Sequence, residues 1–289
     1  VLDFAHLIDP SLAQWIAGNA RFPATMVDRI TPATTSADIT RLTAMTGLYD
    51  GAPVLHEPFR QWVIEDNFVE DMRPDFGAVG VEMVEDVTGF EQMKLRMLNG
   101  SHSALAYLGY LAGHETVSDT VADPAFTAYV RQLWGEIMPV VRAPQGFDLR
   151  DYAQALMKRY ANPKIRHRTW QIAMDGSQKL PQRLLGSLEA NIAAGKPAPG
   201  LCLAVAAWMY YVGGIDQSGQ PIEVKDPMAE RLRAISDAAT TPADKVAALL
   251  SLSEIFPAEL AENLKTPVTE AAQFLWTQGA RKAALEVVT

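Results

Sequence analysis

The sequence predicts an α+β fold that is mainly α-helical. Its 289 residues are 48% hydrophobic and 20% charged, as in a globular chain long enough for one large or two modest domains. Segments of strand-like composition lie before about residue 88. From Gly89 onward, apolar residues recur at steps of three, four and seven, as on the buried face of a helix. We therefore expect two parts, a mixed one over residues 1–88 and a helical one over residues 89–289.

Helices and strands are expected to alternate in the first part. Asp9-Pro10 or Ser11 can begin a helix that Gly18 and Asn19 end. Ser36 is a suitable polar cap for a second helix, because its side-chain oxygen can accept a hydrogen bond from the first turn. Short segments rich in β-branched residues predict strands at residues 24–30, 61–66 and 79–85.

The second part is expected to consist of helices joined at proline and glycine residues. Its first helix starts near Phe90 and ends at Gly113. The connection over residues 191–200 contains two prolines and two glycines, which is typical of a surface loop. Further helical patterns occupy residues 123–141, 148–160, 180–195, 201–212, 226–238, 242–252 and 267–287.

Charge and cysteine content exclude several classes of function. The chain has 25 Lys and Arg against 34 Asp and Glu, a net charge of -9, so a nucleic acid would be repelled by most of the surface. The single cysteine, Cys202, lies in an apolar run and is expected to be a buried, inert thiol. The five histidines lack metal-ligand spacing, so we expect no metal site.

The apolar runs predict a soluble protein, and the single cysteine, which can form no disulfide framework, indicates a reducing, cytoplasmic setting. The longest apolar run, near residues 201–212, is too short to span a bilayer. The first residues lack the pattern of a signal peptide. The chain starts at Val1 rather than Met, which leaves open that its beginning lies elsewhere.

The segment 91–102 concentrates polar side chains within an apolar helix. On an α-helix, with Lys94 at zero, Glu91 falls at about 60°, His102 at about 80° and Asn99 at about 140°. Leucines share that side, and partial burial would lower the pKa of the lysine, so an acid-base cluster is one interpretation. An ordinary surface ion pair beside a buried histidine is the other, and spacing alone favours it.

A second polar segment, residues 162–179, gathers positive charge in an acidic chain. Arg166, Arg168 and Lys179 could hold a carboxylate by charge-assisted hydrogen bonds. From composition alone, a helix face with paired surface charges explains them better. No glycine-rich phosphate-binding motif occurs anywhere in the chain.

Several runs of the sequence resemble the polyol-specific long-chain dehydrogenases/reductases, the mannitol dehydrogenase family. They cover residues 25–32, 57–68 and 94–103, and the most specific mark is Lys94-x-x-x-x-Asn99-x-x-His102. The resemblance continues through residues 170–183 and 211–216, which are most similar to the hexuronate branch of the family. That branch contains fructuronate reductase, also called mannonate oxidoreductase.

The resemblance implies a metal-free, NAD(H)-dependent interconversion of a ketone and a secondary alcohol. Lys94 would be the catalytic acid-base residue, Asn99 would hold the carbonyl oxygen, and His102 would orient the substrate or the lysine. Glu91 would connect the lysine with solvent. The remaining implied positions are Asp28 and Lys179 in the substrate pocket, and Val27 and Asp28 at the cofactor.

Two departures from the family pattern bear on the substrate. Mannitol-type members have an Arg and a His where this chain has Gln171 and Met174. This difference favours a hexuronate over a simple polyol, and Arg166 and Arg168 are candidates to bind its carboxylate.

The family also begins with a Rossmann nucleotide-binding domain that carries a glycine fingerprint. The resemblance implies that this domain largely precedes Val1, that residues 1–88 complete its sheet, and that residues 89–289 form the helical substrate domain. Two alternatives stay open: a mannitol or arabitol dehydrogenase, and an inactive helical binding or assembly module. The choice between NAD and NADP and the oligomeric state are not defined by this sequence.

Overall fold

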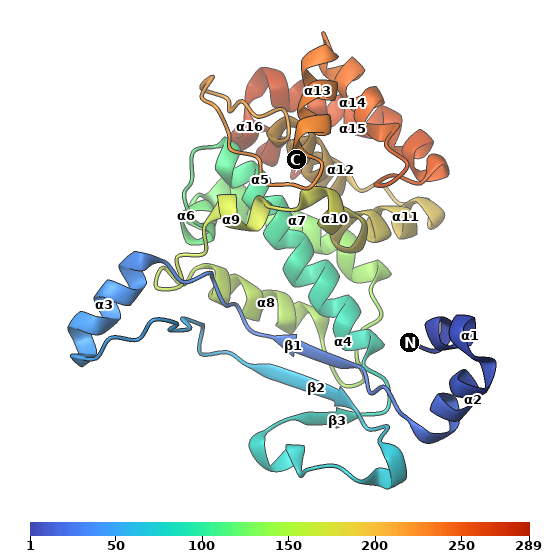
Figure 1. Cartoon of the computed structure of the whole chain (residues 1–289). Helices are drawn as coiled ribbons and strands as arrows, with labels where there is room; N and C mark the ends of the chain where they lie inside the picture. Colours follow the sequence, from blue (N-terminus) through green and yellow to red (C-terminus); the bar gives the residue numbers. More distant parts are fainter.

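The computed structural model describes all 289 residues and shows a small sheet at one end of a helical body (Figure 1). The strands are β1 (Thr25–Asp28), β2 (Gln61–Glu65) and β3 (Glu82–Val84), in that order across the sheet. β1 runs antiparallel to β2, with Met26 opposite Val63, whereas β2 and β3 are parallel. The expectation of an α+β, mainly α-helical fold is confirmed.

The helices around the sheet begin and end at the expected kinds of residue. Asp9 caps its helix by accepting a 2.8 Å hydrogen bond from the Ser11 N–H. Thr35, rather than Ser36, is the cap of the next helix and forms a reciprocal capping box with Asp38. The elements are α1 (Leu2–Ile8), α2 (Pro10–Asn19), α3 (Ser36–Thr46) and the 3₁₀ turns η1 (Val69–Asp71) and η2 (Phe76–Val79).

Helices make up the rest of the chain. A continuous helical segment, α4 (Thr88–Gln92), η3 (Met93–Gly100) and α5 (Ser101–Leu111), runs from the sheet into the helical body (Figure 1). After it come α6 (Val117–Ala122), α7 (Pro124–Ile137), η4 (Met138–Val140), α8 (Leu149–Tyr160), α9 (Thr169–Ala173), α10 (Gly176–Leu180), η5 (Pro181–Leu185), α11 (Gly186–Ala193), α12 (Pro199–Tyr211), α13 (Ala229–Ala238), α14 (Pro242–Leu250), α15 (Ala258–Gln278) and α16 (Ala280–Glu286).

Some boundaries differ from those expected. Pro267 lies inside α15, whereas the sequence pattern suggested that it begins a helix. Gly279 then divides the expected 267–287 helix, because its backbone angles of φ 84° and ψ 161° are open essentially to glycine alone. The third strand is shorter than residues 79–85, since Gly80 has a left-handed conformation with φ 84°. The short helices α6, α9 and α10 were not expected.

The core lies in the helical body and centres on α12, which packs against α5 and α15. This helix is apolar on nearly all sides, as expected for a helix that is buried all round. Cys202 on it is 4% exposed, and burial raises the pKa of its thiol to about 12, so the expected inert cysteine is confirmed. No helix combines the length and the apolar character that crossing a membrane requires.

Candidate active site

The helix that carries Glu91, Lys94, Asn99 and His102 is not a regular α-helix. Residues 93–100 form a π-helix, in which the N–H of each residue bonds to the carbonyl five positions earlier. The angles calculated for an α-helix are therefore wrong over this stretch. Lys94 and Asn99 are five residues apart, so the π-helix places them about one turn apart on one side. Such stretches occur frequently at functional sites.

Side chains from neighbouring helices bind the carbonyl groups where the π-helix passes into α5. The Trp134 indole donates to the Met97 carbonyl at 3.1 Å, and the Tyr160 hydroxyl donates to the Leu98 carbonyl at 2.9 Å. Ser101 also donates to the Met97 carbonyl and lies 2.8 Å from the Tyr160 hydroxyl. These bonds satisfy the buried backbone groups at the irregular point and hold the π-helix in place.

Lys94 lies half-buried on the π-helix with a free ammonium group. No hydrogen bond or ion pair within the chain occupies its Nζ atom, which remains open to solvent. Burial lowers the pKa of Lys94; the negative charge of Asp28 opposes this shift, whereas the positive charges of Arg183 and Arg159 add to it. The side chain thus has the properties required of a proton donor that must also release its proton.

Asn99 and Glu91 lie on the same helical segment and are also partly buried. Neither side chain forms a hydrogen bond within the chain, and neither is cut off from solvent. The carboxamide of Asn99 is therefore free to donate to a ligand oxygen, one π-helical turn from Lys94.

His102 is 5% exposed and packs between two aromatic rings. Its ring centroid lies 4.5 Å from that of Tyr160 and 5.1 Å from that of His167, the latter edge-on. Burial and the neighbouring charges of His167, Arg183 and Arg159 hold the pKa of His102 well below its usual value. His102 is consequently neutral at pH 7, and its ring offers one hydrogen-bond donor and one acceptor.

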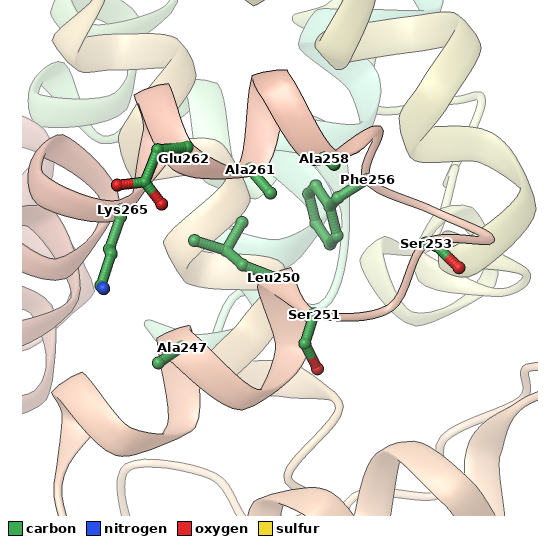
Figure 2. A pocket seen from close by; sticks show the side chains of 9 residues that line it. All are labelled: Ala247, Leu250, Ser251, Ser253, Phe256, Ala258, Ala261, Glu262 and Lys265. Atoms are coloured by element: carbon green, nitrogen blue, oxygen red, sulfur yellow. The ribbon is translucent and has the colours of Figure 1, made fainter.

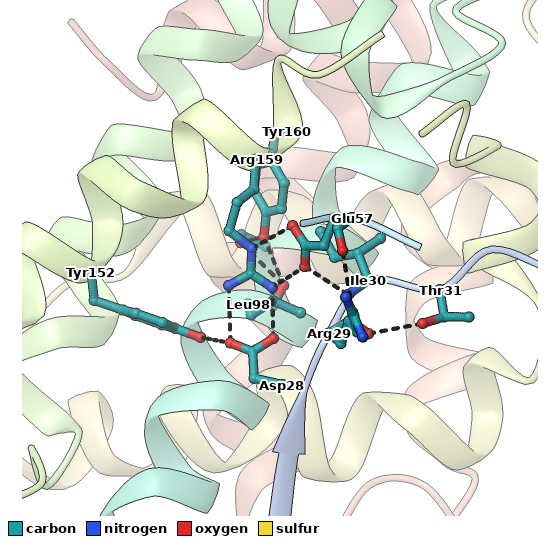
Figure 3. Close-up of polar contacts among 10 residues, drawn as sticks. Asp28, Arg29, Ile30, Thr31, Glu57, Leu98, Tyr152, Arg159 and Tyr160 are labelled. Carbon is teal, nitrogen blue, oxygen red and sulfur yellow. Dashed lines mark hydrogen bonds and ion pairs between the residues drawn. The ribbon is translucent and has the colours of Figure 1, made fainter. Parts of the chain in front are cut away.

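Asp28, at the end of β1, is part of a buried ion cluster with Arg159 of α8 (Figure 3). Arg159 donates to both Asp28 oxygens, at 2.9 and 2.6 Å, and to both Glu57 oxygens, at 3.0 and 2.7 Å. The Tyr152 hydroxyl donates to Asp28 at 2.9 Å. Burial alone would lower the pKa of Arg159, but its bonds to the two carboxylates raise it. The cluster ties the sheet to α8.

This arrangement changes the role expected of Asp28. Both of its oxygens are occupied within the chain, and the residue is 1% exposed, so it does not present a free carboxylate to a substrate or cofactor. Its charge acts on Lys94 instead, by raising the pKa that burial lowers. Val27, the other residue expected at the cofactor, is 50% exposed and available for apolar contact.

The basic residues expected at the carboxylate of the substrate are divided between two locations. Lys179 is half-buried, donates to the Met174 carbonyl at 2.6 Å and pairs with Asp175 at 3.5 Å. Burial and the charge of Arg183 lower its pKa. The side chains of Arg166 and Arg168 are 68% and 48% exposed, and both pair with Glu115. The structure places Lys179 where its charge acts on His167 and where that of Arg183 acts on it, but leaves Arg166 and Arg168 on the surface.

Three further side chains at the site were not expected from the sequence. Tyr160 and His167 flank His102, and Arg183 of η5 donates to Ser103, the neighbour of His102, at 3.1 Å. Arg183 lies four residues after Lys179, a spacing that places two helical residues on one face and offered a signal for it. Tyr160 and His167 belong to other segments, and no local pattern connects them with His102.

Other hollows of the structure lie apart from these residues. One is found between α14 and α15 and is lined by residues such as Leu250, Phe256 and Lys265 (Figure 2). Another, with a mainly apolar lining, lies among α11, α12, α15 and α16. A small pocket does reach the site, where His102, Tyr160, His167 and Arg159 line it together. No group of three or more His, Cys, Asp or Glu side chains is placed to hold a metal ion.

Two family models match the chain and together account for most of its length. Residues 86–276 match the mannitol dehydrogenase C-terminal domain, and residues 1–77 match the mannitol dehydrogenase Rossmann domain. The chain belongs to the mannitol dehydrogenase family. The resemblance noted from the sequence is confirmed. The expectation that the chain lacks the Rossmann domain is partly wrong, because its first 77 residues themselves match the model of that domain.

Named members of the mannitol dehydrogenase family are similar over nearly the whole chain. D-mannonate oxidoreductase of Escherichia coli is 50% identical over 285 residues, which are 98% of this chain and 58% of that protein. Mannitol 2-dehydrogenase of Aspergillus fumigatus is 42% identical over 261 residues, 89% of this chain and 51% of that protein. The chain thus spans little more than half the length of these relatives.

A solved structure from the family has the same fold. It is mannitol 2-dehydrogenase of Pseudomonas fluorescens in a ternary complex with NAD and D-mannitol. It superposes with a TM-score of 0.91 at 36% identity and covers 99% of this chain and 58% of that one.

Proposed function

We propose that the chain is part of an NAD-dependent oxidoreductase that interconverts a keto sugar acid and its alcohol, fructuronate and mannonate. One observation carries the proposal. A single π-helix presents an unpaired, half-buried lysine, a free carboxamide and, at its end, a neutral histidine. Reduction of a ketone needs a proton donor and fixed hydrogen-bond donors at the carbonyl oxygen, and these residues supply both.

In this proposal each residue of the helix has a distinct task. Lys94 gives its proton to the carbonyl oxygen as negative charge develops there. Asn99 donates a hydrogen bond to the same oxygen, and His102, held between Tyr160 and His167, orients the substrate. Glu91, three residues before Lys94, helps to return a proton from solvent to the lysine.

The hydride would come from NADH, which supplies that chemistry when bound. Of the residues assigned to the cofactor, exposed Val27 fits an apolar contact, whereas Asp28 has no free oxygen and acts as a support for Lys94. The chain contains no glycine-rich phosphate loop. We therefore expect the isolated chain not to bind NADH measurably, and saturable binding in calorimetry would contradict this.

The choice of a sugar acid rests on three supports. The 50% identical relative is named D-mannonate oxidoreductase, Gln171 and Met174 replace the Arg and His of mannitol-type members, and unpaired positive charge lies near Lys94. Mannitol 2-dehydrogenase, at 42% identity in Aspergillus fumigatus, supports the alternative of a mannitol or arabitol dehydrogenase. A cytoplasmic location stays a prediction.

A comparison of two ketones decides between these substrates. The enzyme that contains this chain is supplied with NADH and either fructuronate or fructose, and kcat/KM is measured for each by the loss of NADH absorbance. We expect fructuronate to be preferred by at least about tenfold, because a buried cation discriminates against a ligand without a charge. A preference for fructose would replace the proposal by the polyol alternative.

A further inference from the structure

Arg183 carries a charge that no acidic group of the chain neutralises. One hydrogen bond, from its Nη1 atom to the Ser103 hydroxyl at 3.1 Å, holds the guanidinium, and no carboxylate lies within ion-pair distance. Its other nitrogens are not sealed off from solvent. Arg159 is the opposite case, since Asp28 and Glu57 occupy its guanidinium. Because a partly buried charge without a partner is costly, Arg183 is suited to receive an anion from solvent.

The fold holds Arg183 against the helix that bears Lys94. Its element η5 packs on η3, and a Cβ atom added to Gly100 would lie 2.6 Å from the Arg183 carbonyl oxygen, so only glycine allows this approach. Ser103, which receives the guanidinium, follows His102 directly. The charge of Arg183 also lowers the pKa of Lys94, of His102 and of His167. The guanidinium therefore shares the environment of all three side chains.

The groups around Lys94 and Arg183 carry a net positive charge, whereas the whole chain carries a net negative charge. The net charge of the chain is -9. Near Lys94, the carboxylates of Asp28 and Glu57 share the single positive charge of Arg159, which leaves that cluster with one negative charge. Asp175 pairs with Lys179. Lys94 and Arg183 are left as two cations without partners, which favours a ligand that carries one negative charge.

We propose that Arg183 binds the carboxylate of the substrate and thereby selects sugar acids over neutral ketoses, with Ser103 holding its guanidinium in position. A guanidinium can donate two parallel hydrogen bonds to one carboxylate, which gives both affinity and orientation. The inference rests on the proposed function. It assigns to Arg183 the role that sequence analysis gave to the exposed Arg166 and Arg168.

The test measures kcat and KM for fructuronate, and separately for fructose, in the enzyme that contains this chain. We expect Arg183→Met to lower kcat/KM for fructuronate by roughly 30- to 100-fold, mainly through KM, because a charged hydrogen-bonding partner is lost. Turnover of fructose should change less than about threefold. In Arg183→Ala, added guanidinium ion should restore part of the fructuronate activity, which a merely structural role of the arginine would not allow.

Two control variants complete the design. Arg96→Met removes another partly buried arginine of the same helix pair, which donates to the Val140 carbonyl at 2.9 Å, and it should leave the ratio of the two substrates unchanged. The double variant Arg166→Met/Arg168→Met should also leave it unchanged. Loss of acid preference in the double variant but not in Arg183→Met would overturn the inference.

The outcomes also separate this inference from the proposed function. If the unaltered enzyme reduces fructose but not fructuronate, the proposed substrate is wrong and the inference falls with it. If the unaltered enzyme prefers fructuronate and Arg183→Met keeps its KM within threefold, the substrate stands and the inference alone is wrong.

Discussion

Asp28 and Arg159 lie 131 positions apart in the sequence and form a buried, two-point ion pair, with N–O distances of 2.9 and 2.6 Å. The pair joins the end of β1 to the last turn of α8. Each partner also has further bonds, Asp28 from Tyr152 and Arg159 to Glu57, so the buried cluster holds two carboxylates against one guanidinium.

Replacement of Asp28 by Asn should affect both stability and pH dependence. The change removes one of the two carboxylates bonded to the buried Arg159 and breaks a two-point ion pair, so we expect a loss of about 3 kcal/mol in the free energy of unfolding. It also removes the negative charge that raises the pKa of Lys94, so that pKa should fall further. Urea unfolding measures the first effect. The pH profile of ketone reduction measures the second, whose alkaline limb should move to lower pH; an unmoved limb contradicts the electrostatic role.

Replacement of Lys94 by Ala should lower turnover by roughly 100-fold or more, because general acid-base catalysis contributes at least that much. The fold should persist, since no hydrogen bond of the chain depends on this side chain. Steady-state kinetics with NADH, together with circular dichroism, check both points. A variant that retains activity within about threefold of the unaltered enzyme would reject the assignment.

The pH dependence of the two directions should be opposite in sign. Reduction needs protonated Lys94, whereas oxidation needs the neutral amine, and burial places the pKa of this group below its usual 10.5. Reduction is therefore expected to slow, and oxidation to accelerate, as the pH rises through that pKa. Rates measured from pH 6 to 10 in both directions test this, and parallel profiles would exclude Lys94 as the group responsible.

Gly100→Ala should disturb the contact between η3 and η5. The added methyl group would lie 2.6 Å from the backbone oxygen of Arg183. A backbone oxygen cannot move away by rotation about a side-chain bond, as the end of a flexible side chain can. Overpacking of this kind costs about 1–3 kcal/mol. Gly135→Ala in α7 is the matched control, since nothing lies within 4 Å of its added Cβ, and it should be neutral or stabilising. Equal unfolding midpoints for the two variants would contradict the close contact.

His167 should make the protein less stable in mild acid. Burial and the charges of Arg183 and Lys179 lower its pKa to about 4, whereas the unfolded state has the ordinary value of 6.5. Between these values the unfolded chain binds more protons, so stability is full above pH 6.5 and falls as the pH drops toward 4, by about 3 kcal/mol in total. His167→Phe should flatten part of this dependence in urea unfolding at pH 4.5 to 7.5; an unchanged slope would contradict the assignment.

Local sequence signals predicted most of the elements and singled out Lys94, Asn99 and His102 as candidates, but they did not predict the geometry of the helix that carries them. The spacing of Lys94, Asn99 and His102 drew attention to this helix, since apolar periodicity and polar exceptions are both local. The π-helical turn was missed because it depends on Trp134 and Tyr160, which bind its carbonyl groups from distant elements.

Side-chain pairs between residues far apart in the sequence could not be predicted either. Asp28 was expected to face a ligand, but its partner Arg159 comes from a helix more than a hundred residues later, and no spacing rule connects them. Arg166 and Arg168 attracted notice as a charged cluster, although Glu115 pairs with both on the surface. Arg183 attracted no notice from the sequence. Only the packed structure shows that no acidic side chain pairs with this arginine.

The π-helix at residues 93–100 is equivalent to an α-helix into which one surplus residue has been inserted. Excision of one residue between Lys94 and Asn99 would let the coil rewind into an α-helix, in which the two side chains, then four residues apart, still lie on one face. The surplus residue is therefore absorbed within about one turn, and the helices on either side of it keep their mutual alignment. What the excision would remove is the local irregularity at which Trp134 and Tyr160 bind the main chain.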